Sequence, residues 1–239
     1  MDSKDLDYTH LTISEATVIQ NNLRDSLIHA PLDKEIKTIG GADISLNRFS
    51  DVIYAGIVVL DFNTLKPLAY SLVKSKTSFP YVPGFLAFRE VPALIEAYSQ
   101  MVTKPDVIMV DGHGIAHPRR LGIAAHLGAL IDVPTLGCAK KKLYGHFEEP
   151  SVSKNSFSPL MNKEELLGYV VRTKNKVKPV YISPGNQLSM EDSLQIAIHC
   201  TGNYRLPEPT RKAHEFVNRF RIGQLKEGFF QLEENPTLF

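Results

Sequence analysis

Three segments rich in β-branched residues follow one another in the stretch KTIGGADISLNRFSDVIYAGIVVLDFNTLKPLAYSLVKSK (residues 37–76). They cover residues 37–46, 52–62 and 67–76, and only short polar links separate them. Runs of this composition, bounded by turn-forming residues, are typical of β-strands. Links this short join strands that are neighbours in an antiparallel sheet. The stretch therefore predicts a three-stranded antiparallel meander.

Outside the meander, short apolar runs alternate with longer amphipathic stretches. The runs at 106–110 and 133–139 have the pattern of strands that are buried on both faces. The longer stretches carry apolar residues three or four positions apart, which indicates helices. Together these segments predict one mixed α/β sheet flanked by helices. Helices are expected at 16–27, 85–101, 121–130, 189–200 and 210–220, a loop at 148–159, and a hairpin from 167–172 and 179–183.

Local signals predict where several of these helices begin. Ser14 and Thr210 are expected N-caps, and Ser189 with Asp192 forms the pattern of a capping box. Pro92 lies inside an expected helix, so it should break that helix or begin a fresh first turn.

The composition restricts the class of protein. The chain has 239 residues, of which 43% are hydrophobic and 22% charged, and its formal net charge is +1. These values predict one globular domain over residues 1–239 and exclude disordered and fibrous classes. No run approaches the ~20 apolar residues of a membrane-spanning helix, and residues 1–7 are acidic, unlike a secretory signal. We therefore expect a cytoplasmic monomer without a membrane partner, with a flexible tail from about residue 222 to 239 that includes Glu233 and Glu234.

Neither the cysteines nor the net charge points to a particular function. Cys138 and Cys200 cannot build a disulfide framework alone and are expected to be reduced packing residues. A near-neutral chain does not indicate nucleic-acid binding, so such an activity must depend on local patches. Basic clusters occur at 119–120, 140–142 and 172–178. Each of them, taken alone, is more often a solvated face than a phosphate site.

Two aspartates stand in apolar segments of the predicted sheet. Asp43 lies inside the first strand, and Asp111 terminates the strand that the run at 106–110 predicts, directly after Val110. A buried carboxylate must be hydrogen-bonded, paired or bound to metal, although a turn at Gly112 explains Asp111 equally well. If the two strands are neighbours, the carboxylates face each other, and Glu90 on the joining helix can complete the cluster. Three oxygen donors favour Mg²⁺ or Mn²⁺, and paired ions of this kind promote hydrolysis of phosphodiesters.

Cationic side chains are expected around this cluster. Lys140 follows the strand at 133–139 and suits a phosphate or the charge of a transition state. His117, Arg119 and Arg120 follow the glycine turn and suit phosphate contacts. His214 in the last helix is a candidate for assisting a metal, although a surface histidine is the commoner case.

Tyr81 stands in the sequence FPYVPG (residues 79–84). Two prolines and a glycine predict a stiff, irregular loop. A rigid aromatic side chain on such a loop is either part of the core or a wedge that enters between base pairs.

Six blocks of the sequence closely resemble the endonuclease V family. They occur in order between Gly40 and His214, which is most of the chain, and several are eight or more residues long. The blocks are GGAD (40–43), PYVPGFLAFRE (80–90), VDGHG (110–114), HPRRLG (117–122), DVPTLGCAKKK (132–142) and YRLPEPTR (204–211).

The resemblance implies a ribonuclease H-like fold and a repair endonuclease that uses Mg²⁺, for which Mn²⁺ can substitute. Such enzymes recognise deoxyinosine in double-stranded DNA and hydrolyse the second phosphodiester bond 3′ to it. The implied catalytic residues are Asp43, Glu90, Asp111, Lys140 and His214, of which Asp43, Glu90 and Asp111 hold the metal. The implied DNA-contacting residues are the wedge Pro80, Tyr81, Val82 and Pro83, the lesion pocket Gly112, His113, Gly114 and Leu143, and the phosphate contacts His117, Arg119, Arg120 and Lys141.

The sequence also departs from the family and leaves alternatives open. Asn186 stands where many relatives have a histidine, which puts a supporting role there in doubt, and Ala116 and Cys138 replace other small residues. The main alternative is an inosine-specific ribonuclease that acts on single-stranded or structured RNA. Others are a nuclease for branched or flap substrates and a catalytically inactive lesion-binding module. Single-stranded DNA is a further candidate partner.

Overall fold

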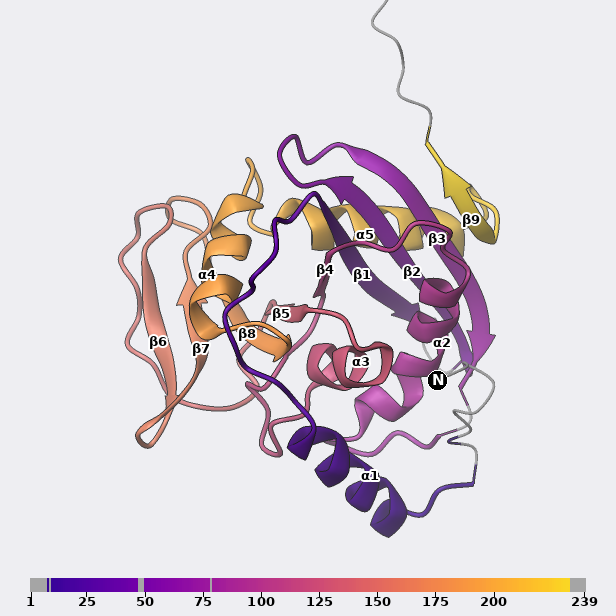
Figure 1. The fold of residues 1–239 in the computed structure, drawn as a ribbon, viewed down its shortest axis with the longest axis horizontal. Helices are drawn as coiled ribbons and strands as arrows, with labels where there is room; N and C mark the ends of the chain where they lie inside the picture. The colour runs from indigo at the N-terminus through magenta and orange to yellow at the C-terminus, as the bar shows by residue number, and fades with distance from the viewer. Residues whose placement is uncertain (1–7, 9, 47–49, 78, 233–239) are drawn as a thin grey trace, which may run out of the picture.

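Nine strands form one mixed sheet in the computed structural model, which describes residues 8, 10–46, 50–77 and 79–232 (Figure 1). Their order across the sheet is β6-β7-β8-β5-β4-β1-β2-β3-β9. The predicted α/β class with a mixed sheet is confirmed. The strands are β1 (Thr38–Leu46), β2 (Val52–Asp61), β3 (Pro67–Lys76), β4 (Val107–Val110), β5 (Thr135–Ala139), β6 (Phe157–Asn162), β7 (Glu165–Val171), β8 (Val180–Asn186) and β9 (Gly228–Gln231).

The central strands are paired as the sequence predicts. β1, β2 and β3 form the antiparallel meander, in which Asp43 lies opposite Gly56. β4 is parallel to β1, and β5 is parallel to β4. Because Ala42 is in register with Val110, the residues that follow them lie at the same level of neighbouring strands. The predicted hairpin also forms, since β7 and β8 pair antiparallel.

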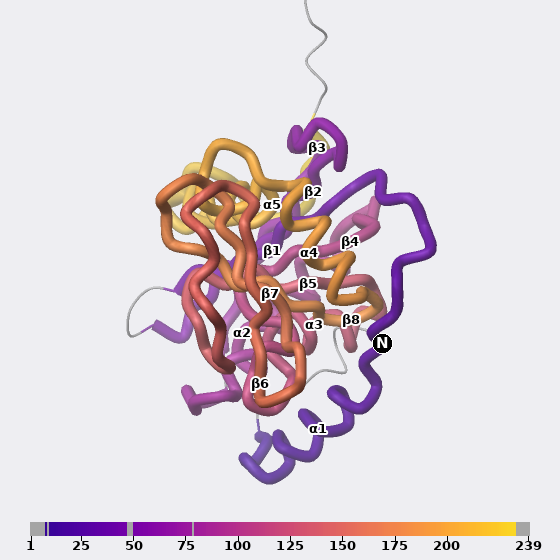
Figure 2. The backbone as a smooth tube through the Cα atoms, turned by 90° about the vertical axis from the view of Figure 1, so that its left-hand side faces the viewer, coloured from indigo at the N-terminus to yellow at the C-terminus, as the bar shows by residue number. Residues whose placement is uncertain are grey.

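Helices cover both faces of the sheet because successive strand residues point to opposite faces. α4 and α5 pack against the face that contains Val58 and Leu60, and α2 and α3 pack against the face that contains Ile57 and Val59. α1 packs on α3 and lies at the lower end of the molecule in the turned view (Figure 2). The helices are α1 (Ile13–Asp25), α2 (Leu86–Ser99), α3 (Ile123–Ile131), α4 (Met190–His199) and α5 (Glu208–Arg221).

Two predicted N-caps are wrong. α1 is capped by Thr12, whose side chain exchanges hydrogen bonds with Glu15, so Ser14 is already inside the helix. α5 begins at Glu208, directly after Pro207, and the Thr210 hydroxyl donates to the carbonyl oxygen of Pro207. The caps lie two and three residues before the predicted ones, because residues upstream of the apolar pattern satisfy the first N–H groups of each helix or need no partner.

The capping box of α4 is confirmed, whereas the predicted break in α2 is wrong. Ser189 and Asp192 make the reciprocal hydrogen bonds of the box. α2 continues through Pro92 without interruption. A proline inside a helix costs ~3 kcal/mol, and the buried apolar face of α2, with Val91 and Leu94 fully covered, offsets that cost.

Both edges of the sheet differ from the prediction. The expected loop at 148–159 ends in β6, where Pro159 is tolerated because an edge strand need not donate on both sides. The expected flexible tail contains β9, which pairs with β3. The acidic residues 1–7 and Glu233 and Glu234 lie outside the described residues. Within the described part of the chain, no helix is long and apolar enough to cross a membrane.

Candidate active site

A close approach of α5 to β1 places the first two site residues. At Gly41 a Cβ atom would lie 1.8 Å from the carbonyl oxygen of Pro209, so a residue with a side chain would push the helix away. Asp43 is two residues further along β1 and faces the same side of the sheet. On α5, His214 places its Nδ1 atom 2.9 Å from Oδ2 of Asp43.

Asp111 joins this pair from the end of β4. Its backbone N–H donates to the carbonyl oxygen of Ala42 over 2.9 Å, which places it beside Asp43. Lys140, directly after β5, forms an ion pair with the Asp111 carboxylate. Burial and the charge of Asp43 raise the pKa of Asp111, while Lys140 opposes that rise. The site therefore holds two neighbouring carboxylates whose repulsion Lys140 offsets only in part.

Asp43, Asp111 and His214 could bind a divalent cation together. Each offers one ligand atom, and the three atoms lie within 4.8 Å of one another. The hydrogen bond to Asp43 raises the pKa of His214, and Nδ2 of Asn218 lies 2.9 Å from Nε2 of the same ring. A cation would relieve the repulsion between the carboxylates, and carboxylate oxygens are ligands that Mg²⁺ and Mn²⁺ accept. The residues present therefore fit the metal that the sequence analysis expects.

Glu90 lies near this group but outside it among the described residues. It lines the neighbouring pocket from α2. Burial raises its pKa to about 8, and the charges of Asp43 and Asp111 act in the same direction against Arg89. The structure therefore places Glu90 within electrostatic reach of both aspartates.

The pKa of Glu90 predicts a pH-dependent stability. An acid whose folded-state pKa is raised stabilises the fold below its ordinary pKa of 4.5, and this contribution is lost as the pH rises towards 8. In metal-free protein, Glu90→Gln should therefore raise the melting temperature relative to wild type at pH 8.5. We expect a gain of ~2–4 °C, which corresponds to about 1 kcal/mol.

The measurement is thermal unfolding of both proteins in chelator at pH 5 and pH 8.5. The gain should be much smaller at pH 5, where wild-type Glu90 is already protonated. An equal change in melting temperature at both pH values would show that Glu90 does not titrate as described.

A pocket of about 480 Å³ opens beside the carboxylates. It brings together Asp111 and Glu90 with most of the predicted wedge and lesion-pocket residues. Gly114 is outside this lining, because it packs against Pro184 and its N–H donates to the Ser183 hydroxyl. The pocket is lined by Tyr81, Val82, Pro83, Gly84, Leu86, Ala87, Glu90, Asp111, Gly112, His113, His117, Pro118, Arg119, Leu121, Gly122, Ile123 and Leu143.

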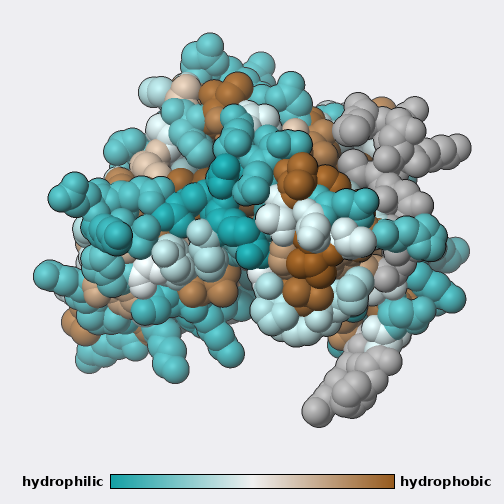
Figure 3. Space-filling model, turned by 90° about the horizontal axis from the view of Figure 1, so that it is seen from below, coloured by the Kyte–Doolittle hydropathy of each residue, from teal (hydrophilic) through white to brown (hydrophobic). Residues whose placement is uncertain are grey.

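The lining is largely apolar and contains two neutral histidines. Burial lowers the pKa of His113 and of His117 to about 4. At Gly112 a Cβ atom would lie 2.4 Å from Ile123, so the glycine keeps the pocket open. Seen from below, hydrophobic patches lie next to hydrophilic surface on this side of the molecule (Figure 3).

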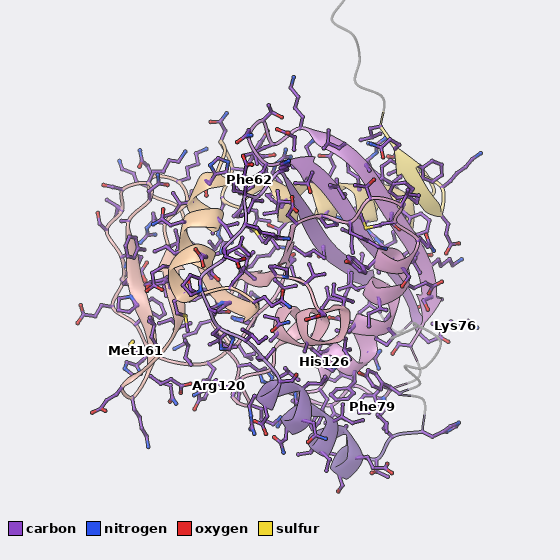
Figure 4. The ribbon with its side chains drawn as sticks, viewed as in Figure 1. Phe62, Lys76, Phe79, Arg120, His126 and Met161 are labelled. Atoms are coloured by element: carbon purple, nitrogen blue, oxygen red, sulfur yellow. The ribbon has the colours of Figure 1, made fainter. Side chains whose placement is uncertain are left out.

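The predicted stiff loop, residues 79–84, forms one wall of the pocket. Its first residue, Phe79, is buried against Phe85 and Phe88. Its tip, Tyr81, is 72% exposed. Phe79 and Arg120 lie on either side of α1 in the stick view (Figure 4). The loop thus combines a buried base with a projecting aromatic ring.

Three of the four predicted phosphate-contact residues have partners inside the protein. His117 is buried, and its Nδ1 accepts from the backbone N–H of Arg119. Arg119 donates to the carbonyl oxygen of Gly84 and to Gln20. Arg120 pairs with Glu165. Lys141 is exposed on the surface, and phosphate contact by any of the four stays a prediction.

Polar residues that support the site escaped the sequence analysis. Asn218 is one turn after His214 on α5, a spacing that places both on one helix face and that the sequence does show. Arg89 donates to the carbonyl oxygen of Phe79 over 2.6 Å, and Gln20 donates to that of Gly84 over 3.0 Å. No local pattern marks Gln20, because its partner is 64 residues away.

The residues that depart from the family pattern have packing roles. Asn186 accepts from the N–H of Ile28 and donates to the carbonyl oxygen of Gly128, both over 3.0 Å. It therefore joins the segment after α1 to α3. Ala116 and Cys138 are fully buried, and burial raises the pKa of the Cys138 thiol. The two cysteines are free, as predicted.

Comparison with known proteins shows similarity over most of the chain. A family model described as Endonuclease V matches residues 21–215. Endonuclease V of Nostoc punctiforme is 45% identical over 208 residues, which is 87% of this chain and 94% of that protein. Endonuclease V of Dictyoglomus thermophilum is 44% identical over 219 residues, or 92% and 95% of the two chains.

Solved structures show the same similarity in three dimensions. The crystal structure of endonuclease V from Streptomyces avermitilis has a TM-score of 0.85 at 35% identity, over 90% of this chain and 95% of that one. Endonuclease V of Ciona intestinalis, crystallised with a 24mer DNA that contains an inosine followed by a ribo-adenosine, has a TM-score of 0.78 at 29% identity. That match covers 88% of this chain and 97% of the Ciona chain. The expected ribonuclease H-like fold is thereby confirmed.

Proposed function

The chain belongs to the endonuclease V family, and we propose that it is a cytoplasmic, metal-dependent DNA repair endonuclease for deoxyinosine. It would hydrolyse the second phosphodiester bond 3′ to the lesion and leave the lesion in the nicked strand. The observation that carries this proposal is the position of Asp43, Asp111 and His214 beside a pocket walled by the loop of Tyr81. Such a site can receive a base and hydrolyse a nearby phosphodiester.

Asp43, Asp111 and His214 would hold a divalent cation, Mg²⁺ or Mn²⁺, with Glu90 close by. When bound, the cation would supply activation of water and neutralise charge on the leaving oxygen. Nδ1 of His214 contacts Asp43 and Nε2 contacts Asn218, so one of these two contacts would give way when His214 binds the cation. Lys140 keeps a positive charge beside Asp111, where it can stabilise the charge that develops on the phosphate.

The pocket offers a way to select the lesion. Inosine pairs weakly, so its base leaves the helix at a cost of only a few kcal/mol. A backbone N–H near Gly112 can donate to the oxygen of hypoxanthine, where adenine presents an amino group. A pocket built for an acceptor rejects a donor because a buried polar group would stay unpaired. Because His113 and His117 are neutral, neither histidine adds a charge to this pocket.

Tyr81 would fill the gap that the displaced base leaves in the helix. Base–aromatic stacking contributes ~1–3 kcal/mol, so Tyr81→Ala should lower the preference for inosine over adenine about tenfold. The readout is the ratio of kcat/KM for two duplexes that differ only at that base. Stabilisation of the protein by Mg²⁺ should not change, because the ligand group consists of Asp43, Asp111 and His214 and Tyr81 is exposed at the loop tip.

A matched control for this substitution is Phe157→Ala. Phe157 is 50% exposed, but it lies on the edge strand β6, at the far side of the sheet from the meander. Its replacement should leave the inosine preference intact. An unchanged preference in Tyr81→Ala would contradict the wedge role.

An inosine-specific ribonuclease is the second candidate function. The observation that favours it is the ribo-adenosine that follows the inosine in the DNA bound by the Ciona enzyme. Choice of sugar depends on whether the groove admits a 2′-hydroxyl group. Single-stranded DNA and inosine-containing RNA therefore stand beside double-stranded DNA as proposed partners of a monomeric enzyme.

Cleavage of matched DNA and RNA duplexes, each with one inosine and with Mg²⁺ present, distinguishes the candidates. A DNA cut one nucleotide beyond the inosine supports the repair function. Cleavage restricted to RNA would favour the ribonuclease. Binding of both without cleavage would contradict both and leave a lesion-binding module.

A further inference from the structure

The carbonyl oxygen of Gly84 receives two hydrogen bonds at the end of the wedge loop, residues 79–84. Nε2 of Gln20 donates over 3.0 Å, and Nη2 of Arg119 donates over 2.7 Å. Nε of Arg119 also donates to Oε1 of Gln20, so the three residues form a closed triangle. The guanidinium of Arg119 lies 4.3 Å from the ring centre of Phe85, which covers the triangle on one side.

The triangle depends on a glycine at position 84. The φ angle of Gly84 is +82°, a conformation that residues with a side chain rarely adopt. A Cβ atom there would also lie 2.4 Å from Nη2 of Arg119. The backbone at Gly84 is therefore pressed directly against the Arg119 guanidinium.

Gln20 is a buried polar residue on α1, with 1% of its surface exposed. Burial of an amide is costly unless both of its ends are hydrogen-bonded. Apolar residues of α1 pack nearby, with Ala16 in the cluster of Phe79 and Leu23 against a cluster that contains Leu121. Gln20 thus departs from the apolar face of α1 at the point where the helix meets the wedge loop.

The other end of the same loop is also held. The carbonyl oxygen of Phe79 accepts from Nη1 of Arg89 over 2.6 Å, and the Phe79 ring is buried in an aromatic cluster. Between these two ends, Tyr81 projects with 72% of its surface exposed. The direction of the projecting ring is consequently set by how firmly both ends are anchored.

We propose that Gln20 and Arg119 are positioning residues that clamp Gly84 and thereby aim Tyr81 at the gap that the displaced base leaves in the helix. This inference rests on the proposed function. It also gives Arg119 a role other than phosphate contact. Without the clamp, the loop would take several positions, and Tyr81 would lose entropy on entering the helix. The clamp is therefore expected to affect recognition of the lesion more than hydrolysis.

The test is a double-mutant cycle between Gln20→Leu and Tyr81→Ala, read as the inosine-to-adenine ratio of kcat/KM. Gln20→Leu removes both hydrogen bonds of the amide and should lower that ratio about tenfold. Most of the loss should appear in KM, with kcat changed less than about twofold. In the double variant the ratio should equal that of Tyr81→Ala alone, because the clamp acts through the tyrosine. If each substitution lowered the inosine-to-adenine ratio by its own factor and the two factors multiplied in the double variant, the proposal would be wrong.

Two further variants separate the clamp from general stability. Asn186→Leu removes another buried amide, which is 3% exposed. This amide bonds Ile28 and Gly128 and does not contact the wedge loop among the bonds described. Its loss should lower stability but leave the inosine-to-adenine ratio unchanged. If Gln20→Leu does not fold, Gln20→Glu keeps the shape but loses the donor to Gly84 and should lower the ratio as well. A folded Gln20 variant with the wild-type ratio would refute the clamp. A wild-type enzyme without inosine preference would instead refute the proposed function.

Discussion

Cleavage of an inosine-containing duplex is expected to fall by ~10³-fold or more when Asp43 is replaced by alanine. Asp43 supplies one of two carboxylates that would hold the cation, and it also orients His214. Asp43→Ala removes both contributions at once, whereas Asp43 itself is not among the described residues that line the pocket. Affinity for the substrate should therefore be largely retained. Single-turnover cleavage and equilibrium binding, measured on the same duplex, give the two quantities.

A matched control is available at the opposite end of the same two strands. Asp106 precedes β4 and accepts hydrogen bonds from the backbone N–H groups of Lys37 and Thr38 at the start of β1. Asp106→Ala should lower stability but leave the cleavage rate of the folded protein near that of wild type. Cleavage by Asp43→Ala within tenfold of wild type would exclude Asp43 as a metal ligand.

Replacement of Lys140 by alanine is expected to lower turnover about 10²-fold at neutral pH. Lys140 follows the last residue of β5 and forms an ion pair with Asp111. Its ammonium group is therefore next to the proposed site of hydrolysis. Its charge also lowers the pKa of Asp111. Without it, that pKa rises further, so the carboxylate forms only at higher pH. The acid limb of the pH–rate profile should therefore move to higher pH in Lys140→Ala.

Two variants test whether the charge of Lys140 is responsible. Lys140→Arg keeps a cation and should restore most of the rate and the wild-type pH profile. Lys142→Ala removes a charge from the same lysine run, at a residue 5.9 Å from the Phe147 ring, and should have little effect. A pH profile that is identical in Lys140→Ala and wild type would contradict the electrostatic role.

Local pattern accounts for the strands at the centre of the sheet. The β-branched runs of the meander and the short apolar runs of β4 and β5 were predicted because hydrophobic period and strand length are local properties. The same argument places Asp43 on a strand and Asp111 directly after one, and it requires a partner for each. The edges behaved differently, since β6 contains Pro159 and β9 has no fully buried residue, and neither has a strong pattern of its own.

Partners that are distant in the sequence could not be predicted in this way. Arg119 and Arg120 have the composition of a phosphate site, yet the fold supplies Gln20, Gly84 and Glu165 as their partners. A charge on the surface and a charge turned inward look identical in a sequence.

The sequence by itself determined the α/β sheet, the stiff loop that carries Tyr81 and the candidate carboxylates, because each depends on residues close together in the chain. Only the tertiary structure decided which side chains meet. Asp43 and His214 are 171 residues apart, and they touch because Gly41 lets α5 approach β1. The same packing leaves Glu90 outside the group of three ligand atoms. Contacts of this kind depend on distances between packed elements, which no local pattern of residues contains.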